Sequence, residues 1–286
     1  MRRKESAKAY LFLSPAIILA LVFLFYPMAT AFVSSFLKIG QNGKVLGFAG
    51  LGNYKKLFLD KGFQNAILTT LKFAILFVPI NTALTLLAAS LTRKRKKLTS
   101  LFEYVFATPI VVSLAAYSLI FKEIFRGRVS IINRIFSLEV EWLSEKFPAL
   151  VVLVLLGVFL DFGLDYLLLL SAFRSTDKNI IDAAKVDGAS DSAIYFRIEL
   201  PLVKRMLITT ILLAIKDALM ISAPVIILTE GGPFRSTETV MFYYYIEAFK
   251  SGNRAIQNSL SVIISVLFIA VMAIYYRRRD KHEKRY

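Results

Sequence analysis

The sequence contains no cysteine and a single histidine, His282, among its 286 residues. Thiolate chemistry, Cys-based zinc sites and His-containing catalytic triads are therefore excluded. The phosphate-binding pattern Gly-x-x-x-x-Gly-Lys-Ser/Thr is also missing, since the isolated pair Gly43-Lys44 is followed by Val45. We therefore expect no catalytic site, no metal site and no nucleotide cofactor on this chain.

Polar residues are scarce over long stretches of the chain. Hydrophobic residues make up 57% of it, with 24 Phe and a mean hydropathy of +0.61. A soluble domain holds only about 45–50% apolar residues, so the composition indicates an integral membrane protein. The net charge of +16 would suggest nucleic acid binding in a soluble protein. Because the basic residues gather at the ends of apolar runs, we expect contact with membrane lipid and none with nucleic acid.

Six apolar segments approach or exceed the roughly 20 residues needed to cross a bilayer. They predict an all-α, polytopic membrane protein whose residues 1–286 form a single transmembrane domain. The first segment is too long for a cleaved signal peptide and lacks a small-residue cleavage pattern, so we expect it to be retained. The expected spans are about 9–36, 65–91, 101–124, 147–173, 204–229 and 256–276.

The distribution of Lys and Arg predicts that both termini of this multi-pass protein lie on the cytoplasmic side of the cell membrane. With that orientation the inner loops carry more basic residues than the outer loops, as the positive-inside rule requires. The inner basic residues are Arg2, Arg3, Lys4 and Lys8, the run Arg93 to Lys97, six residues from Arg174 to Arg205, and six from Arg277 to Arg285.

The stretch 176–201, between the fourth and fifth spans, is too charged to cross lipid and must lie in water. Thr176 or Asp177 can cap a first helix that runs to about Asp187, and Gly188 suits a left-handed helix end. Ser190 can cap a second helix, which we expect to stop before Pro201.

Each of these two short helices offers a small apolar surface. The residues are Ile180, Ile181, Ala183 and Ala184 on the first, and Ile194, Tyr195 and Ile198 on the second. Such a helix can lie in a groove of a soluble partner or rest on the membrane surface, and the composition alone leaves both alternatives open.

The run Asp182-Ala183-Ala184-x-x-Asp187-Gly188-Ala189, followed by Ile198-x-Leu200-Pro201, resembles the EAA signature of ABC importer permeases. The resemblance implies that the segment forms cytoplasmic coupling helices, which seat in a cleft of a separate ATPase subunit. The implied contact residues are Asp182, Ala183, Ala184, Asp187, Gly188 and Ala189. Asp182 stands where the family usually has Glu, and Tyr195 where a Phe is common.

A second resemblance covers most of the chain. Its motifs are Tyr10 to Pro15, Phe48 to Tyr54, Leu228 to Pro233 with Thr237, and Tyr243, Tyr245 and Ala248-Phe249. They are similar to motifs of carbohydrate permeases in the maltose and glycerol-phosphate group, in particular the first of two paired permeases. The implied outer-loop signature is Gly231, Gly232, Pro233 and Thr237. Ser236 or Thr237 can cap a short helix after this turn. Lys122 departs from the pattern, which often has Trp there.

The resemblance implies a sugar or oligosaccharide importer. Its implied partners are a second permease subunit, two ATPase subunits that carry ATP and Mg, and an extracytoplasmic solute-binding protein. Three alternatives stay open: a permease of the same type for another solute, an ion-coupled secondary transporter, and a membrane-embedded enzyme or scaffold.

Lys216 and Asp217 lie in the middle of the fifth span. A charge at mid-bilayer costs roughly 2.5–3.5 kcal/mol on insertion scales, so both should face a cavity, a partner helix or a counter-charge. They could line a polar path for hydroxyl-rich cargo together with Asn81, Tyr117, Ser222 and Pro224. A structural pair that joins two permease subunits is the alternative.

Overall fold

A computed structural model describes residues 12–40, 42–94 and 97–283 of the chain. The expected inner residues Arg2, Arg3, Lys4 and Lys8 lie outside the described residues, as do Tyr10 and Leu11 of the N-terminal motif, Arg95, Lys96, Lys284 and Arg285. Within the described residues, the secondary structure is helical apart from one two-stranded sheet.

The chain divides into two compact units, of which the first comprises residues up to 63 together with those from 244 onward. Its elements are a helix over Phe12–Ser35 that includes η1 (Leu21–Phe25) and α2 (Tyr26–Ser35), β1 (Leu37–Ile39), β2 (Val45–Phe48), α3 (Gly52–Leu59), η4 (Ile246–Lys250) and α14 (Arg254–Glu283). The strands pair antiparallel with Leu37 opposite Phe48. The carbonyl of Ser35 accepts hydrogen bonds from Asn53 and Ser259, which fasten α3 and α14 to the end of α2.

The second unit comprises residues 64–243. Its elements are α4 (Lys61–Thr92, which starts in the first unit), α5 (Lys97–Ala107), η2 (Thr108–Ile110), α6 (Leu114–Ile124), α7 (Ile131–Phe136), α8 (Lys146–Arg174), α9 (Lys178–Val186), α10 (Asp191–Ile194), η3 (Tyr195–Glu199), α11 (Leu200–Met220), α12 (Ala223–Leu228) and α13 (Val240–Tyr245, which ends in the first unit).

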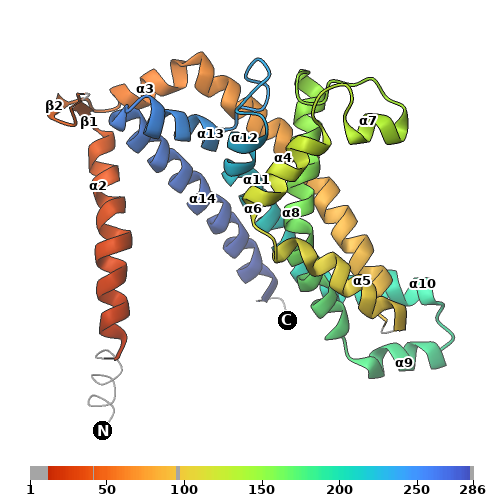
Figure 1. The fold of residues 1–286 in the computed structure, drawn as a ribbon. Helices are drawn as coiled ribbons and strands as arrows, with labels where there is room; N and C mark the ends of the chain where they lie inside the picture. The colour runs from red at the N-terminus through yellow and green to blue at the C-terminus, as the bar shows by residue number, and fades with distance from the viewer. Residues whose placement is uncertain (1–11, 41, 95–96, 284–286) are drawn as a thin grey trace, which may run out of the picture. The chain divides into compact units, whose positions relative to one another are not determined.

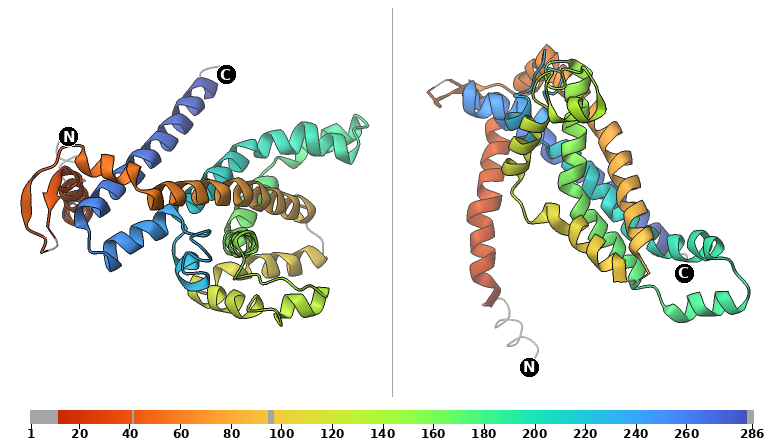
Figure 2. Two further views of the ribbon diagram at one scale, coloured as in Figure 1. Left: turned by 90° about the horizontal axis from the view of Figure 1, so that it is seen from above. Right: turned by 45° about the vertical axis from the view of Figure 1, so that its right-hand side comes forward.

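Helix α8 is the centre of the second unit, and α5, α6, α11 and α12 pack against it. Its core is fully buried at Tyr166 and Leu169. Gly157 lets the rings of Phe73 and Phe77 approach closely, since a Cβ there would lie 3.1–3.2 Å from them. Figures 1 and 2 show α9 and α10 at one end of α8, and α7 and the loop between α12 and α13 at the other.

Three described helices are long and apolar enough to span a membrane, namely Phe12–Ser35, Lys61–Thr92 and Lys146–Arg174. They correspond to the first, second and fourth expected spans. The sixth expected span falls on α14, whose apolar part runs over Arg254–Ala270. The total of six spans and their orientation stay predictions.

The third and fifth expected spans are broken. The segment over 101–124 is two helices that meet at 98°, because Pro109 lies in the 3₁₀ turn η2 that follows α5, and Ser113 caps the helix that comes next. In the fifth segment the helix stops at Met220 and restarts at Ala223, with Pro224 in the first turn of α12. The stretch between the first and second expected spans contains the hairpin and α3.

Candidate functional site

The first candidate site is the solvent-exposed helix α9 with its end residues. The Asp177 carboxylate accepts a hydrogen bond from the backbone N–H of Asn179 at 2.9 Å and caps the helix. Gly188 adopts a φ of +80°, and the N–H of Ala189 reaches the carbonyl of Ala184 at 2.9 Å. This geometry closes the helix with a left-handed residue, so the predicted cap and bend are confirmed.

None of the side chains of α9 is buried. Val186 is 89% exposed, and Ile180 and Ala183 are exposed beside it. Asp182 accepts a hydrogen bond of 2.9 Å from Lys185, three residues along the same helix, and this bond raises the pKa of Lys185 above its ordinary value. The exposed surface of α9 therefore combines an apolar strip with an ion pair, Asp182 and Lys185, whose two members belong to the same helix.

The second short helix differs from the prediction. Ser190 caps α10 as expected, since its hydroxyl accepts from the N–H of Ala193 at 3.3 Å. The helix does not stop before Pro201, because η3 is a π-helical turn that carries the chain directly into α11, where Pro201 lies in the first turn. The Leu200 N–H bonds to the carbonyl of Tyr195, and this wider turn accommodates the proline.

The apolar residues of this second helix turn toward the protein. Ile194 is buried, while Tyr195 and Ile198 are half-buried. These three side chains, expected to face a partner, thus take part in the internal packing. The large apolar side chains of the segment that stay exposed are those of α9 and Phe196 of η3, which is 64% exposed.

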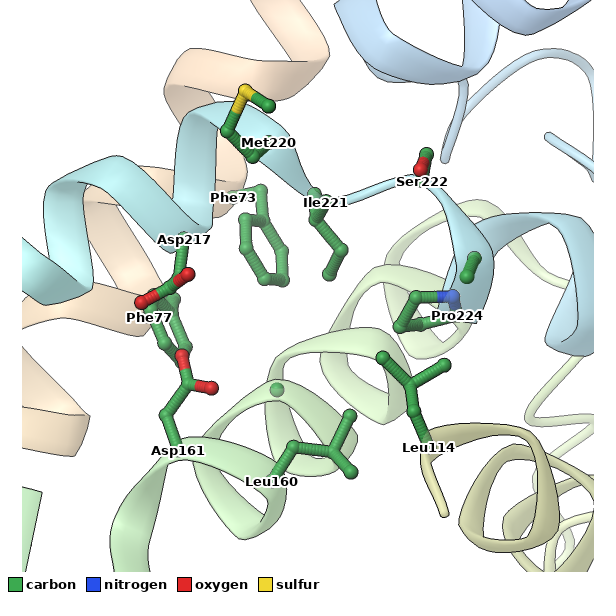
Figure 3. Close-up of a pocket in the computed structure, with 12 residues that line it drawn as sticks. Phe73, Phe77, Leu114, Leu160, Asp161, Asp217, Met220, Ile221, Ser222 and Pro224 are labelled. Atoms are coloured by element: carbon green, nitrogen blue, oxygen red, sulfur yellow. The ribbon is translucent and has the colours of Figure 1, made fainter. Parts of the chain in front are cut away.

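The second candidate site is a cavity of about 180 Å³ between α4, α8 and the break after α11. Figure 3 shows the carboxylates of Asp161 and Asp217 facing each other on one side of it, near the rings of Phe73 and Phe77. The residues around the cavity are Phe73, Phe77, Leu114, Gly157, Leu160, Asp161, Asp217, Met220, Ile221, Ser222, Ala223 and Pro224. The structure thus brings together the predicted residues Asp217, Ser222 and Pro224.

Asp217 forms an ion pair with Lys216, the residue before it in the sequence. The Lys216 ammonium group lies 2.6 Å from a carboxylate oxygen of Asp217, and the two side chains are 40% and 35% exposed. Asp161 supplies a further carboxylate from α8, so acidic groups outnumber basic ones around the cavity.

Two other predicted residues lie apart from the cavity. Asn81 is fully buried, and its amide nitrogen donates to Asp165 at 2.7 Å. Tyr117 is buried and forms a T-shaped pair with Phe159, with ring centroids 4.7 Å apart, and it is not among the residues around the cavity. Neither side chain contributes to this cavity.

Asp161 and Asp165 are absent from the residues selected from the sequence. They stand one helical turn apart in α8, within the expected span 147–173. The signal that could have found them is the one that selected Lys216 and Asp217, a charge inside an apolar run of membrane-spanning length.

The residues of the outer-loop signature are held in place by hydrogen bonds within the loop. Gly231 has a φ of +81°, and the peptide bond between Gly232 and Pro233 is cis. The Thr237 hydroxyl lies 2.6 Å from the carbonyl of Gly232, to which it donates, and 2.7 Å from the hydroxyl of Thr229. These bonds fold the loop onto the end of α12.

The helix after this loop is capped by a different residue from those predicted. Thr239, and not Ser236 or Thr237, accepts the N–H of Phe242 at 3.3 Å. Thr237 is already engaged inside the loop, so α13 begins only at Val240.

Comparison with known proteins gives consistent matches. Residues 81–286 match the family described as "Binding-protein-dependent transport system inner membrane component". The chain is 30% identical to the lactose transport system permease protein LacF of Rhizobium radiobacter, over 98% of this chain and 97% of LacF. It is 25% identical to the sn-glycerol-3-phosphate transport system permease protein UgpA of Agrobacterium fabrum, over 95% and 94% of the two chains.

A solved structure has the same fold. It is a chain of a bacterial ABC transporter involved in the import of the acidic polysaccharide alginate, with a TM-score of 0.84 at 18% identity. The alignment covers 98% of this chain and 99% of that chain.

Proposed function

The chain belongs to the family of binding-protein-dependent transport system inner membrane components, and from this premise we propose that it is a permease subunit of an ATP-driven importer of sugars or oligosaccharides. The relatives named for lactose and glycerol-phosphate transport agree with the resemblance to carbohydrate permeases. The observation that carries the proposal is the position of Asp182 to Ala189, the stretch that resembles the EAA signature, in the last turns of the exposed helix α9 and the bend that follows it.

The proposed assembly has this subunit in the cell membrane with six spans and both termini in the cytoplasm. It pairs with a second permease, and each contributes half of a central path. Two ATPase subunits carry ATP and Mg and dock on the cytoplasmic side, while an extracytoplasmic binding protein delivers the solute to the outer loops. The likeness in fold to an alginate transporter chain supports this arrangement.

Helix α9 is the proposed docking element for one ATPase subunit. A short amphipathic helix gains affinity by laying its apolar strip into a groove, and α9 exposes such a strip. Closure of the ATPase pair on ATP would then displace α9 and shift the permease between outward-facing and inward-facing states. Nucleotide binding to the ATPase and the equilibrium between the outward-facing and inward-facing states are then linked by a coupling free energy.

The cavity beside Asp161 and Asp217 is the proposed part of the solute path in this subunit. Carboxylates accept hydrogen bonds from hydroxyl groups, and aromatic rings offer an apolar face to a sugar. Asp161, Asp217 and the rings of Phe73 and Phe77 supply both kinds of contact within one cavity. Lys216 neutralises part of the acidic charge.

The test is purification of the tagged chain from its native membrane, followed by reconstitution. We expect an ATPase and a second permease to accompany it, and uptake into liposomes to require ATP and the binding protein. Transport of a sugar by the isolated chain, driven by an ion gradient without ATP, would instead favour a secondary transporter built on Lys216 and Asp217.

A further inference from the structure

Arg93 directly follows α4 and reaches the segment between α10 and α11. Its Nε donates to the Glu199 carboxylate at 2.8 Å, and the two side chains are only 18% and 6% exposed. Glu199 is the last residue of η3, the turn through which the segment enters α11. This ion pair is therefore a shielded connection between the end of α4 and the start of α11.

Two further contacts fix the guanidinium group of Arg93. Its Nη1 donates to the carbonyl of Ser90 at 2.6 Å, within the last turn of α4. Its Cζ lies 4.9 Å from the ring centroid of Tyr195, a cation–π contact, and that ring stacks on Phe173 of α8. These contacts hold the Arg93 side chain in one conformation between the last turn of α4 and Tyr195 of η3, whose ring packs on α8.

A second arginine extends the same arrangement. Arg174, the last residue of α8, binds the Glu103 carboxylate of α5 through both terminal nitrogens, at 2.5 and 3.0 Å. It also donates to the carbonyl of Thr92 at 3.0 Å. Bidentate guanidinium–carboxylate pairs hold their partners in a defined orientation. The ends of α4 and α8 therefore meet the middle of α5 at one polar junction beside η3.

A neighbouring ion pair joins the same two segments without being shielded. Lys94 lies 2.9 Å from Asp191, the first residue of α10, but these side chains are 49% and 75% exposed. Its hydrogen bond lowers the pKa of the Asp191 carboxyl. Exposed pairs of this kind contribute little because water screens them. The buried pair Arg93–Glu199 can therefore be compared with the solvent-exposed pair Lys94–Asp191.

We propose that Arg93 is a positioning residue that makes η3 and the end of α4 move as one piece. This inference rests on the proposed function. Displacement of the α9–α10 segment by the ATPase is then passed to α4 through Arg93 and Glu199. Phe77 lies on α4 about 24 Å from Arg93 along the helix axis, at 1.5 Å per residue. Because Phe77 lines the cavity, a displacement of α4 moves the cavity wall.

The first test compares ATP hydrolysis by the reconstituted complex with Arg93→Met or Glu199→Gln. The stimulus is the binding protein with the sugar, from a panel of lactose, maltose, maltotriose and raffinose, that most activates the wild type. We expect unchanged assembly and basal hydrolysis, and stimulated hydrolysis reduced at least about fivefold, the lower range of a coupling free energy. Arg93→Lys should restore part of it, whereas Lys94→Met and Asp191→Asn should behave as wild type.

The second test needs no substrate. Because the chain has no cysteine, spin labels can be placed at Ser192→Cys and Leu91→Cys, provided that the partner subunits carry no reactive cysteine. We expect one narrow distance that is the same with and without ATP, and a broadened distribution when Glu199→Gln is added. Full stimulation in the Arg93→Met and Glu199→Gln complexes, or a narrow distance in the Glu199→Gln background, overturns the proposal. If none of the sugars stimulates ATP hydrolysis by the wild-type complex, that result counts against the proposed function alone. The distance between the two spin labels then still decides whether Arg93 is a positioning residue.

Discussion

The amide nitrogen of Asn81 donates a hydrogen bond of 2.7 Å to the carboxylate of Asp165, and this bond joins α4 to α8 where both side chains are buried. The two residues are far apart in the sequence, so the bond fixes the register of the two helices. A buried acid without its donor loses a hydrogen bond to a charged group, which is a large effect for one side chain.

Replacement of Asn81 should therefore destabilise the subunit. We expect Asn81→Leu to lower the free energy of unfolding by about 1.5–3 kcal/mol, seen as a lower Tm of the detergent-solubilised protein. The double change Asn81→Leu with Asp165→Leu should recover part of the loss, because no unpaired acid is left buried. Thr82→Val is the matched control, since the buried hydroxyl of Thr82 has no hydrogen-bond partner among the described residues. Equal losses in Asn81→Leu and Thr82→Val would contradict the assignment.

The acids of the cavity should affect transport without affecting assembly. We expect Asp161→Asn, Asp217→Asn and Lys216→Met each to reduce sugar uptake by the reconstituted complex, because each removes a polar or charged group at or beside the cavity wall. Asp165→Asn is the control, since this acid lies one turn away and is not among the residues around the cavity. Unchanged uptake in all three variants would remove these residues from the path.

The outer loop should depend on the hydroxyl of Thr237. Thr237→Val keeps the shape of the side chain but loses the hydrogen bonds to Gly232 and Thr229. We expect reduced stimulation of ATP hydrolysis by the binding protein, with the stability cost of about 1–3 kcal/mol typical of an unsatisfied buried partner. Thr237→Ser retains the hydroxyl and should restore stimulation. If Thr237→Val is stimulated like the wild type, the loop does not contact the binding protein in the way proposed.

The absence of cysteine makes the orientation directly testable. Val186 and Phe234 are 89% and 83% exposed. Val186 ends α9, and Phe234 belongs to the loop between α12 and α13, which lies at the opposite end of the second unit from α9 (Figure 1). In intact cells, a membrane-impermeant maleimide should label Phe234→Cys from outside and leave Val186→Cys unlabelled until the membrane is opened. The opposite pattern would reverse the proposed orientation.

Local chemistry made part of the fold predictable from the sequence. Asp177, Gly188 and Ser190 act through neighbours within a few residues, and their caps and bend follow from side-chain type and backbone preference. The continuation of the helix through η3 could not be predicted in the same way. It depends on a π-helical turn that accommodates Pro201 and on tertiary contacts of Tyr195, which no local rule contains.

The candidate sites were predictable to different degrees. Lys216 and Asp217 are predictable as charges in an apolar run, and Asp161 and Asp165 carry the same signal. Only the tertiary fold decides that Asp161 faces the cavity and that Asp165 pairs with Asn81. Tyr117 is an aromatic residue of suitable type, but only the packing of α6 on α8 decides that it meets Phe159. The pairing of Arg93 with Glu199 spans more than a hundred residues of sequence and follows from the tertiary fold alone.

In the proposed function, force from ATP hydrolysis enters the permease through α9. The most direct measurement is the ATP hydrolysis of the assembled complex, with and without sugar-loaded binding protein, for Asp182→Lys and Gly188→Pro. Proline cannot adopt the φ of +80° that Gly188 has, whereas Asn tolerates it, so Gly188→Asn is the control. We predict that both variants insert in the membrane and lose stimulation, while Gly188→Asn keeps it. Normal stimulation in Asp182→Lys and Gly188→Pro would contradict the claim.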